Sequence, residues 1–219
     1  MSGFKYDRNR TIMKKQVLYI HGGESFWKHG DFIERLRTVD LWHLPTQDDL
    51  GGYKKWTSTL AEDLGEAYEV ILPPMPNKQN AKFAEWSIWF ERHFEYLQDG
   101  AILIGCSLGA MFLAKYLSQN DVPFRPGAVF LLAGAYKLPG FDETDCGDFL
   151  IAPEAVRPVV GKIDKLIIMH SQDDHVAPYE HGVALSKAIP EAEFVMFTDK
   201  NHFLIPVFPE LLDHIHTLQ

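Results

Sequence analysis

The sequence predicts an α/β protein in which a mostly parallel six-stranded sheet lies between layers of helices. Short apolar segments of strand length alternate with amphipathic segments of helical period, which is the pattern of a parallel sheet wrapped by helices. The third, fourth and fifth apolar segments are almost continuously apolar, as expected for strands covered on both faces. The 219 residues are 46% hydrophobic and contain no internal repeat or linker. We therefore predict a single three-layer domain over residues 16–219.

The elements follow one another in a regular order. The predicted strands are short apolar runs: Gln16–Ile20, Tyr68–Leu72, Ala101–Ile104, Ala128–Leu132, Lys165–His170 and Glu193–Phe197. The predicted helices have apolar residues at helical spacing: Tyr53–Gly65, Asn80–Leu97, Leu108–Gln119, Pro178–Ala188 and Pro206–Leu218. Two longer irregular segments, Gly22–Gly52 and Ala135–Lys162, leave the edge of the sheet where ligands collect. We expect at least one of them to line a site.

Residues 1–15 are predicted to form a flexible tail ahead of the first strand. This stretch is basic, but the apolar run that follows it, Val17–Ile20, is too short for a secretory signal. No apolar stretch approaches the roughly 20 residues of a membrane span. The two cysteines, Cys106 and Cys146, are expected to be free thiols in a reducing compartment, so we expect a cytoplasmic protein. The formal charge of −9 argues against a nucleic-acid-binding or anionic-membrane surface.

The segment Gly105-Cys106-Ser107-Leu108-Gly109 carries the clearest functional pattern. It follows a buried strand and opens a helix, which is the setting in which G-x-S-x-G forms a sharp turn around a nucleophilic serine. Glycines two positions to either side remove the clashes that such a turn would create. We therefore predict Ser107 as the nucleophile of a serine hydrolase. Cys106 precedes the apex of the turn and is not expected to take this role.

A serine nucleophile needs a base and an acid that orients the base. Of ten histidines, His202 is the best placed, because it lies in the loop between the last strand and the last helix. Two adjacent acids, Asp173 and Asp174, follow the fifth strand, and spacing alone does not separate them. Either gives the chain order serine, acid, histidine that this arrangement requires.

The tetrahedral intermediate also needs backbone donors for its oxyanion. The amide of Leu108, next after the serine at a helix start, is the first predicted donor. The second is predicted in the loop after the first strand, at Gly23 or Glu24. No metal-binding spacing and no phosphate-binding glycine loop is present in the sequence, so neither a metal nor a cofactor is expected.

Together these residues resemble the α/β-hydrolase superfamily from Val17 to Leu218. Leu72-Pro73-Pro74-Met75-Pro76-Asn77, Trp86 and Ile102–Gly109 resemble the small capless serine hydrolases typified by retinoblastoma-binding protein nine. The resemblance implies a sheet order of 2-1-3-4-5-6 and no large cap domain. It favours Asp174 over Asp173 as the acid, since Asp174 is followed by the x-apolar-x-Pro frame common in the superfamily.

The expected activity is carboxylesterase-like hydrolysis of small to medium acyl esters or thioesters through an acyl-enzyme. Phe26, Trp27, Phe141 and Phe149 of the two irregular segments are predicted to form an apolar pocket under an acidic rim. Three alternatives remain open: amide or peptide hydrolysis by the same triad, acyl transfer, and a binding or scaffolding protein of the same fold with little turnover.

Overall fold

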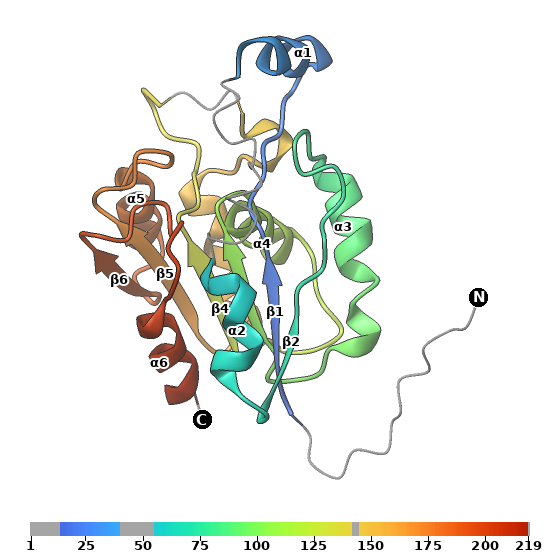
Figure 1. Ribbon diagram of the computed structural model, residues 1–219, viewed down its shortest axis with the longest axis vertical. Helices are drawn as coiled ribbons and strands as arrows, with labels where there is room; N and C mark the ends of the chain where they lie inside the picture. Colours follow the sequence, from blue (N-terminus) through green and yellow to red (C-terminus); the bar gives the residue numbers. More distant parts are fainter. Residues whose placement is uncertain (1–13, 40–54, 142–144, 219) are drawn as a thin grey trace, which may run out of the picture.

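A six-stranded parallel sheet forms the centre of the computed structural model, which describes residues 14–39, 55–141 and 145–218 (Figure 1). The strand order is β2-β1-β3-β4-β5-β6, and every neighbouring pair is parallel. The strands are β1 (Lys15–Ile20), β2 (Tyr68–Ile71), β3 (Ile102–Cys106), β4 (Ala128–Leu132), β5 (Leu166–Ser171) and β6 (Glu193–Phe197). The six predicted strands and the predicted order are confirmed, with shifts of one or two residues at the ends.

Helices cover both faces of the sheet (Figure 1). One face packs against α2 (Trp56–Leu64) and α6 (Pro209–Thr217). The other packs against α3 (Phe83–Glu91), α4 (Leu108–Gln119) and α5 (Glu180–Ala188). Alternate residues of each buried strand supply the two cores, as the two-residue period of a strand requires. The predicted three-layer arrangement is confirmed, and the described residues contain no large cap domain.

Several helices are shorter than predicted. The predicted helix over 80–97 begins only at Phe83, whose amide donates to the Asp148 carboxylate at 3.1 Å. It ends at Glu91, and a separate 3₁₀ turn, η3 (Phe94–Tyr96), follows it. The last helix begins at Pro209 rather than at Pro206, since Phe208, the residue before it, has a non-helical backbone with φ −138° and ψ 69°. Residues 53 and 54 of the first predicted helix lie outside the described residues.

The two predicted irregular segments contain helical structure that was not predicted. Helix α1 (His29–Thr38) lies in the first; Phe32, Ile33 and Leu36 have helical spacing, but none of its residues is buried. The 3₁₀ helices η4 (Gly147–Phe149) and η5 (Pro153–Lys162) lie in the second. The segments touch where Ser25 pairs with Cys146 in an isolated bridge. Residues 40–52 and 142–144 lie outside the described residues.

The amino-terminal part of the predicted tail, residues 1–13, also lies outside the described residues. Strand β1 begins at Lys15, one residue before the predicted start. Both cysteines are buried free thiols, as the sequence predicts. Across the ranges that the structure describes, no helix combines the length and apolar character needed to cross a membrane.

Candidate active site

Ser107 lies at the turn between β3 and α4, and its backbone is strained. Its φ of 56° and ψ of −122° are rare for a residue that carries a side chain. The turn is held on both sides: the Ser107 amide donates to the Leu132 carbonyl at 2.8 Å, and its carbonyl accepts from the Ala110 amide at 2.9 Å. Strain of this kind persists only where the surrounding structure enforces it, which makes the residue a functional candidate.

The glycines around Ser107 have a direct steric cause. A Cβ atom on Gly105 would lie 2.7 Å from the Ala110 amide nitrogen, and one on Gly109 would lie 2.8 Å from the His21 carbonyl oxygen. On the other side of the serine, a Cβ on Gly22 would lie 3.4 Å from the Ser107 hydroxyl oxygen. The chain leaving β1 therefore passes directly beside the candidate nucleophile.

Asp174 and His202 form a buried hydrogen-bonded pair. The Nδ1–H group of His202 donates to the Asp174 carboxylate, with 2.8 Å to Oδ2 and 3.0 Å to Oδ1. Oδ1 also accepts from the amides of Val176 and Ala177, both at 2.9 Å. The carboxylate is thereby fixed in one orientation. This is the geometry in which an acid sets the tautomer of a histidine base and stabilises its cation.

Asp173 has a different role. Its side chain is exposed. The carboxylate accepts hydrogen bonds from the Asn201 amide, at 2.8 Å, and from the Ser171 hydroxyl. The Ser171 hydrogen bond lowers the pKa of this carboxyl below its ordinary value. Asp173 thus joins the loop after β5 to the loop that carries His202, while Asp174 contacts the imidazole.

Ser107, Asp174 and His202 follow strands β3, β5 and β6 and therefore lie at the same edge of the parallel sheet. No hydrogen bond joins the Ser107 hydroxyl to His202 in the part of the chain that the structure describes. Catalytic hydrogen bonds are often long without substrate and shorten when it binds. Cys106 lies beside this site, and burial raises the pKa of its thiol to about 12. A thiol that stays protonated is a poor nucleophile. This agrees with the prediction from the sequence that Cys106 is not the nucleophile.

The candidate oxyanion donors differ in their availability. Leu108 is the first residue of α4, so its amide has no helical carbonyl to bond. The Glu24 amide donates to the Lys78 carbonyl at 2.8 Å, and the Glu24 side chain pairs with Arg35 at 2.7 Å. Gly23 lies against the Leu108 side chain, since a Cβ there would be 3.3 Å from Leu108 Cδ2. Of the two alternatives, the geometry favours Gly23.

A family model described as serine hydrolase matches residues 50–206, which is most of the chain. The chain belongs to the serine hydrolase family. No curated protein matches its sequence.

The fold of this serine hydrolase is similar to those of several solved structures. The ydeN gene product of B. subtilis is 17% identical over 94% of this chain and 98% of its own, with a TM-score of 0.67. The esterase domain of a Rhodothermus marinus protein is 16% identical over 90% of this chain and 81% of its own, with a TM-score of 0.56. A meta-cleavage product hydrolase from Pseudomonas fluorescens is 15% identical over 94% of this chain and 90% of its own, with a TM-score of 0.58. At these identities the likeness establishes the α/β-hydrolase fold alone.

A groove of about 560 Å³ opens beside the site of the serine hydrolase. Its walls come from β1, the start of α2 and the segment after β2, and they include Tyr19, His21, Thr57, Pro74, Met75 and Lys78. The His21 ring holds this segment in place: Nδ1–H donates to the Gly22 carbonyl at 2.7 Å, and Nε2 accepts from the Met75 amide at 2.9 Å. Burial lowers the pKa of His21, in keeping with a neutral ring that accepts at Nε2.

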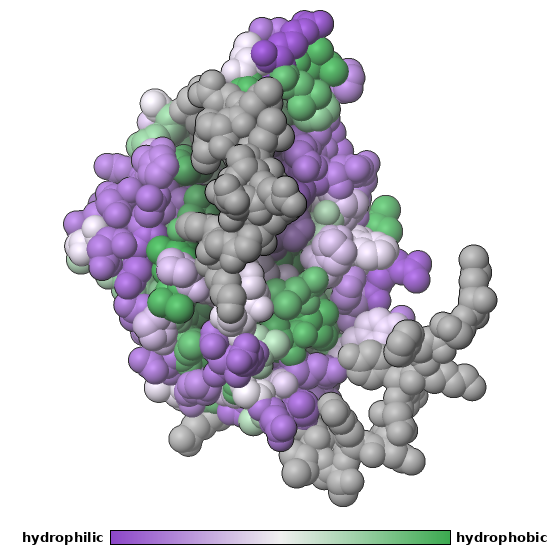
Figure 2. All heavy atoms as spheres, in the orientation of Figure 1, coloured by the Kyte–Doolittle hydropathy of each residue, from purple (hydrophilic) through white to green (hydrophobic). Residues whose placement is uncertain are grey.

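The apolar pocket predicted from four aromatic residues is not formed as expected. Phe149 is fully buried in the core, with its ring centroid 5.1 Å from that of Trp86, so it cannot line a pocket. Phe26 is also buried, whereas Trp27 is 67% exposed. Two exposed apolar residues, Val176 and Leu204, instead lie two positions along the chain from Asp174 and His202, respectively. On the face of the molecule that Figure 2 draws, the apolar residues form separate patches within a mainly hydrophilic surface.

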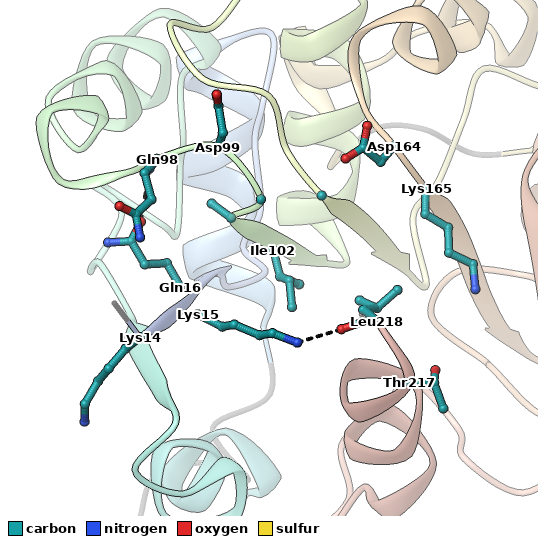
Figure 3. Close-up of a pocket in the computed structure, with 13 residues that line it drawn as sticks. Lys14, Lys15, Gln16, Gln98, Asp99, Ile102, Asp164, Lys165, Thr217 and Leu218 are labelled. Carbon is teal, nitrogen blue, oxygen red and sulfur yellow. Dashed lines mark hydrogen bonds between the residues drawn. The ribbon is translucent and has the colours of Figure 1, made fainter. Parts of the chain in front are cut away.

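A second hollow, of about 830 Å³, lies at the opposite edge of the sheet (Figure 3). Two of its lysines have partners: Lys15 donates to the Leu218 carbonyl at 2.8 Å, and Lys165 pairs with Glu193 at 2.7 Å. It is lined by the amino ends of the strands and is separate from Ser107. Among the described residues, no three histidine, cysteine or acidic side chains are grouped to hold a metal ion.

One residue of the site was missed from the sequence. His170, near the end of β5, points at the carboxylate of Asp174, with 3.5 Å between Nε2 and Oδ2. The available signal was a histidine inside an otherwise apolar strand four residues before the acid.

Proposed function

We propose that this serine hydrolase cleaves carboxyl esters or thioesters of small to medium acyl groups. In this proposal Ser107 is the nucleophile, His202 the general base and Asp174 the acid that orients it. The main support for this proposal is the buried hydrogen bond between Asp174 and His202. It lies at the same edge of the sheet as the strained turn of Ser107. Two buried free thiols support a reducing compartment, and we propose the cytoplasm.

The first half of the reaction forms the acyl-enzyme. The Ser107 hydroxyl attacks the ester carbonyl carbon while His202 Nε2 takes its proton, and Asp174 stabilises the resulting imidazolium through Nδ1–H. The amides of Leu108 and Gly23 donate to the oxyanion. The intermediate collapses as the imidazolium returns the proton to the leaving alcohol or thiol. The C–O or C–S bond of the substrate breaks, and the acyl group remains on Ser107.

Water completes the cycle. His202 removes a proton from a water molecule, and the hydroxide attacks the acyl carbon to form a second oxyanion in the same pair of amides. Collapse releases the carboxylic acid and returns the proton to Ser107. We propose that the groove of about 560 Å³ between β1, α2 and the segment after β2 receives part of the substrate, because its wall includes His21, which precedes the Gly22 that lies beside Ser107.

The test combines covalent labelling with turnover. A fluorophosphonate probe and the p-nitrophenyl esters of acetate, butyrate and octanoate are applied to the wild type and to Ser107→Ala. We expect labelling and turnover in the wild type and a loss of both in the variant. A maximum rate with acetate or butyrate would agree with the proposed preference for small to medium acyl groups.

Other outcomes favour the alternatives. A folded wild type that neither labels nor turns over esters would overturn the proposal in favour of a binding protein. Faster cleavage of matched anilides than of esters would identify an amidase. Preferential capture of the acyl group by an added alcohol or amine, rather than by water, would identify acyl transfer.

A further inference from the structure

Asp174 lies between two buried histidines, of which the proposed mechanism uses one. His170, on β5, is 1% exposed, and its Nε2 atom lies 3.5 Å from the Oδ2 oxygen that receives the His202 proton. The same nitrogen lies 2.7 Å from the Ala177 carbonyl oxygen. The carboxylate is therefore approached by one imidazole from β5 and by another from the loop after β6.

These contacts determine the tautomer of His170. A carbonyl oxygen only accepts, so Nε2 must carry the hydrogen that bonds to Ala177. Ala177 in turn donates its amide to Asp174 Oδ1 at 2.9 Å. His170 thus holds the turn from Asp174 to Ala177 by donating to the Ala177 carbonyl. The same turn holds the carboxylate, because the Ala177 amide donates to it.

The surroundings keep His170 neutral. Burial is the main cause that lowers its pKa, with a smaller contribution from His202, and it outweighs the Ala177 hydrogen bond, Asp174 and Glu180, which act in the opposite direction. His181 of α5 is a further titratable neighbour, and burial lowers its pKa as well. A neutral His170 places no positive charge beside Asp174 and acts on the carboxylate through Ala177, whose carbonyl accepts from Nε2–H and whose amide donates to Oδ1. The negative charge of Asp174 therefore remains available to the His202 imidazolium.

Helix α5 is shaped to seat this ring. A Cβ atom on Gly182 would lie 2.8 Å from both Cβ and Nδ1 of His170. Alanine is favoured over glycine in a helix interior, so the close approach of His170 gives glycine at this position a steric cause. The ring position is therefore defined from two sides, by hydrogen bonding at Nε2 and by close packing at Nδ1.

We propose that His170 is a positioning residue for the catalytic acid, holding the Asp174 carboxylate in line with His202 Nδ1 through its Nε2–H group. This inference rests on the proposed function. It differs from a packing role, because packing requires only the shape of the ring, whereas positioning requires the N–H group at the place of Nε2.

Three variants separate the two roles. His170→Phe keeps a ring of similar size without a donor, His170→Gln restores an N–H donor near the place of Nε2, and Gly182→Ala displaces the ring without changing any polar group. Gly30→Ala is the matched control, because a Cβ atom on that helical glycine meets nothing within 4 Å. Each variant is measured for kcat and KM on p-nitrophenyl acetate, for melting temperature, and for the downfield proton resonance of His202 Nδ1–H.

We expect His170→Phe to lower kcat by about tenfold or more with KM within about twofold, since small misplacements of catalytic groups have effects of this order. The His202 Nδ1–H resonance should broaden or disappear in His170→Phe and return in His170→Gln together with most of kcat. Gly182→Ala should lower kcat, and Gly30→Ala should not.

Two results would overturn the inference. One is a folded His170→Phe variant with wild-type kcat and an unchanged resonance. The other is a His170→Gln variant as impaired as His170→Phe, which would leave only ring packing. The resonance is read without turnover. If the wild type proves inactive, the proposed function fails, while the positioning of Asp174 by His170 is still decided by the resonance.

Discussion

The adjacent aspartates Asp173 and Asp174 have different roles because their side chains point in opposite directions. Asp174 is buried and accepts from His202 and two backbone amides, whereas Asp173 is exposed and joins two loops. The sequence contains both and does not separate them by spacing. Side-chain direction at the end of β5 separates them in the structure.

This difference leads to a paired substitution. Asp174→Asn should lower kcat by about 10³- to 10⁴-fold, because an amide at this position favours the wrong tautomer of the base and removes the charge that stabilises its cation. Asp173→Asn should change kcat by less than about tenfold, since it alters only the contact with Ser171 and Asn201. Steady-state turnover of p-nitrophenyl acetate measures both. A larger loss in Asp173→Asn than in Asp174→Asn would reverse the assignment.

Ser107 and His202 could be selected from the sequence because each stands in a local pattern, a strand–turn–helix motif in one case and a loop after the last strand in the other. The second oxyanion donor could not be selected. Whether Gly23 or Glu24 is available depends on the Lys78 carbonyl, which lies more than fifty positions further along the chain and takes up the Glu24 amide. His170 was missed for a related reason, because a histidine four residues before the acid does not by itself show that the two side chains meet; the 3.5 Å approach is seen only in the folded structure.

At the scale of elements, helix α3 is anchored by a segment distant in sequence. The Asp148 carboxylate accepts from the Phe83 amide, with 3.1 Å to Oδ1 and 3.2 Å to Oδ2. Lys82, which precedes the helix, offers no side-chain acceptor. The start of α3 is therefore satisfied by tertiary structure, which explains why the sequence predicted it three residues too early.

Asp148→Ala should destabilise the protein by about 1 kcal/mol, the usual effect of losing a helix cap. For a domain of this size the melting temperature should fall by about 2–4 °C, as calorimetry would detect. Asp148→Asn retains an acceptor oxygen and should lose less than half of this amount. Equal destabilisation by the two variants would mean that charge rather than hydrogen bonding anchors the helix.

The strands were predicted better than the helices because their signal is intrinsic. Continuous apolar runs such as those of β3 and β4 have few structures open to them other than a buried strand. In contrast, α1 buries none of its residues, and η5 is a 3₁₀ helix with Pro158 inside it. The apolar residues of η5 that are buried, Pro153, Val156 and Val159, follow the three-residue spacing of a 3₁₀ helix rather than the period of an α-helix.

For the whole molecule, three histidines are held in or near the interior in a state that resists protonation. Burial is the first cause that lowers the pKa of His21, His170 and His181 below the ordinary value of 6.5. In the unfolded chain these rings regain the ordinary value. Between the ordinary and the lowered pKa, the unfolded state therefore binds more protons than the folded state.

The free energy of unfolding should accordingly be greatest above pH 6.5 and fall as the pH decreases from there through the lowered folded-state values. Urea unfolding at pH 7.5 and pH 5.5 would measure this, in a range above the titration of the acidic side chains. His181→Gln should reduce the number of protons taken up on unfolding by up to one, which lowers the slope of the free energy of unfolding against pH. A stability that is constant or increases on acidification would contradict the prediction.

Lys15 and Leu218 meet through a hydrogen bond of 2.8 Å at the edge of the sheet opposite to the candidate active site. A surface, fusion partner or affinity matrix joined to the protein at either of these positions would face away from Ser107 and leave substrate access open. The same proximity allows a short peptide to connect residues 15 and 218, so that new termini can be opened elsewhere in the chain. The geometry of this edge thus makes the serine hydrolase suitable for oriented immobilisation and for circular permutation.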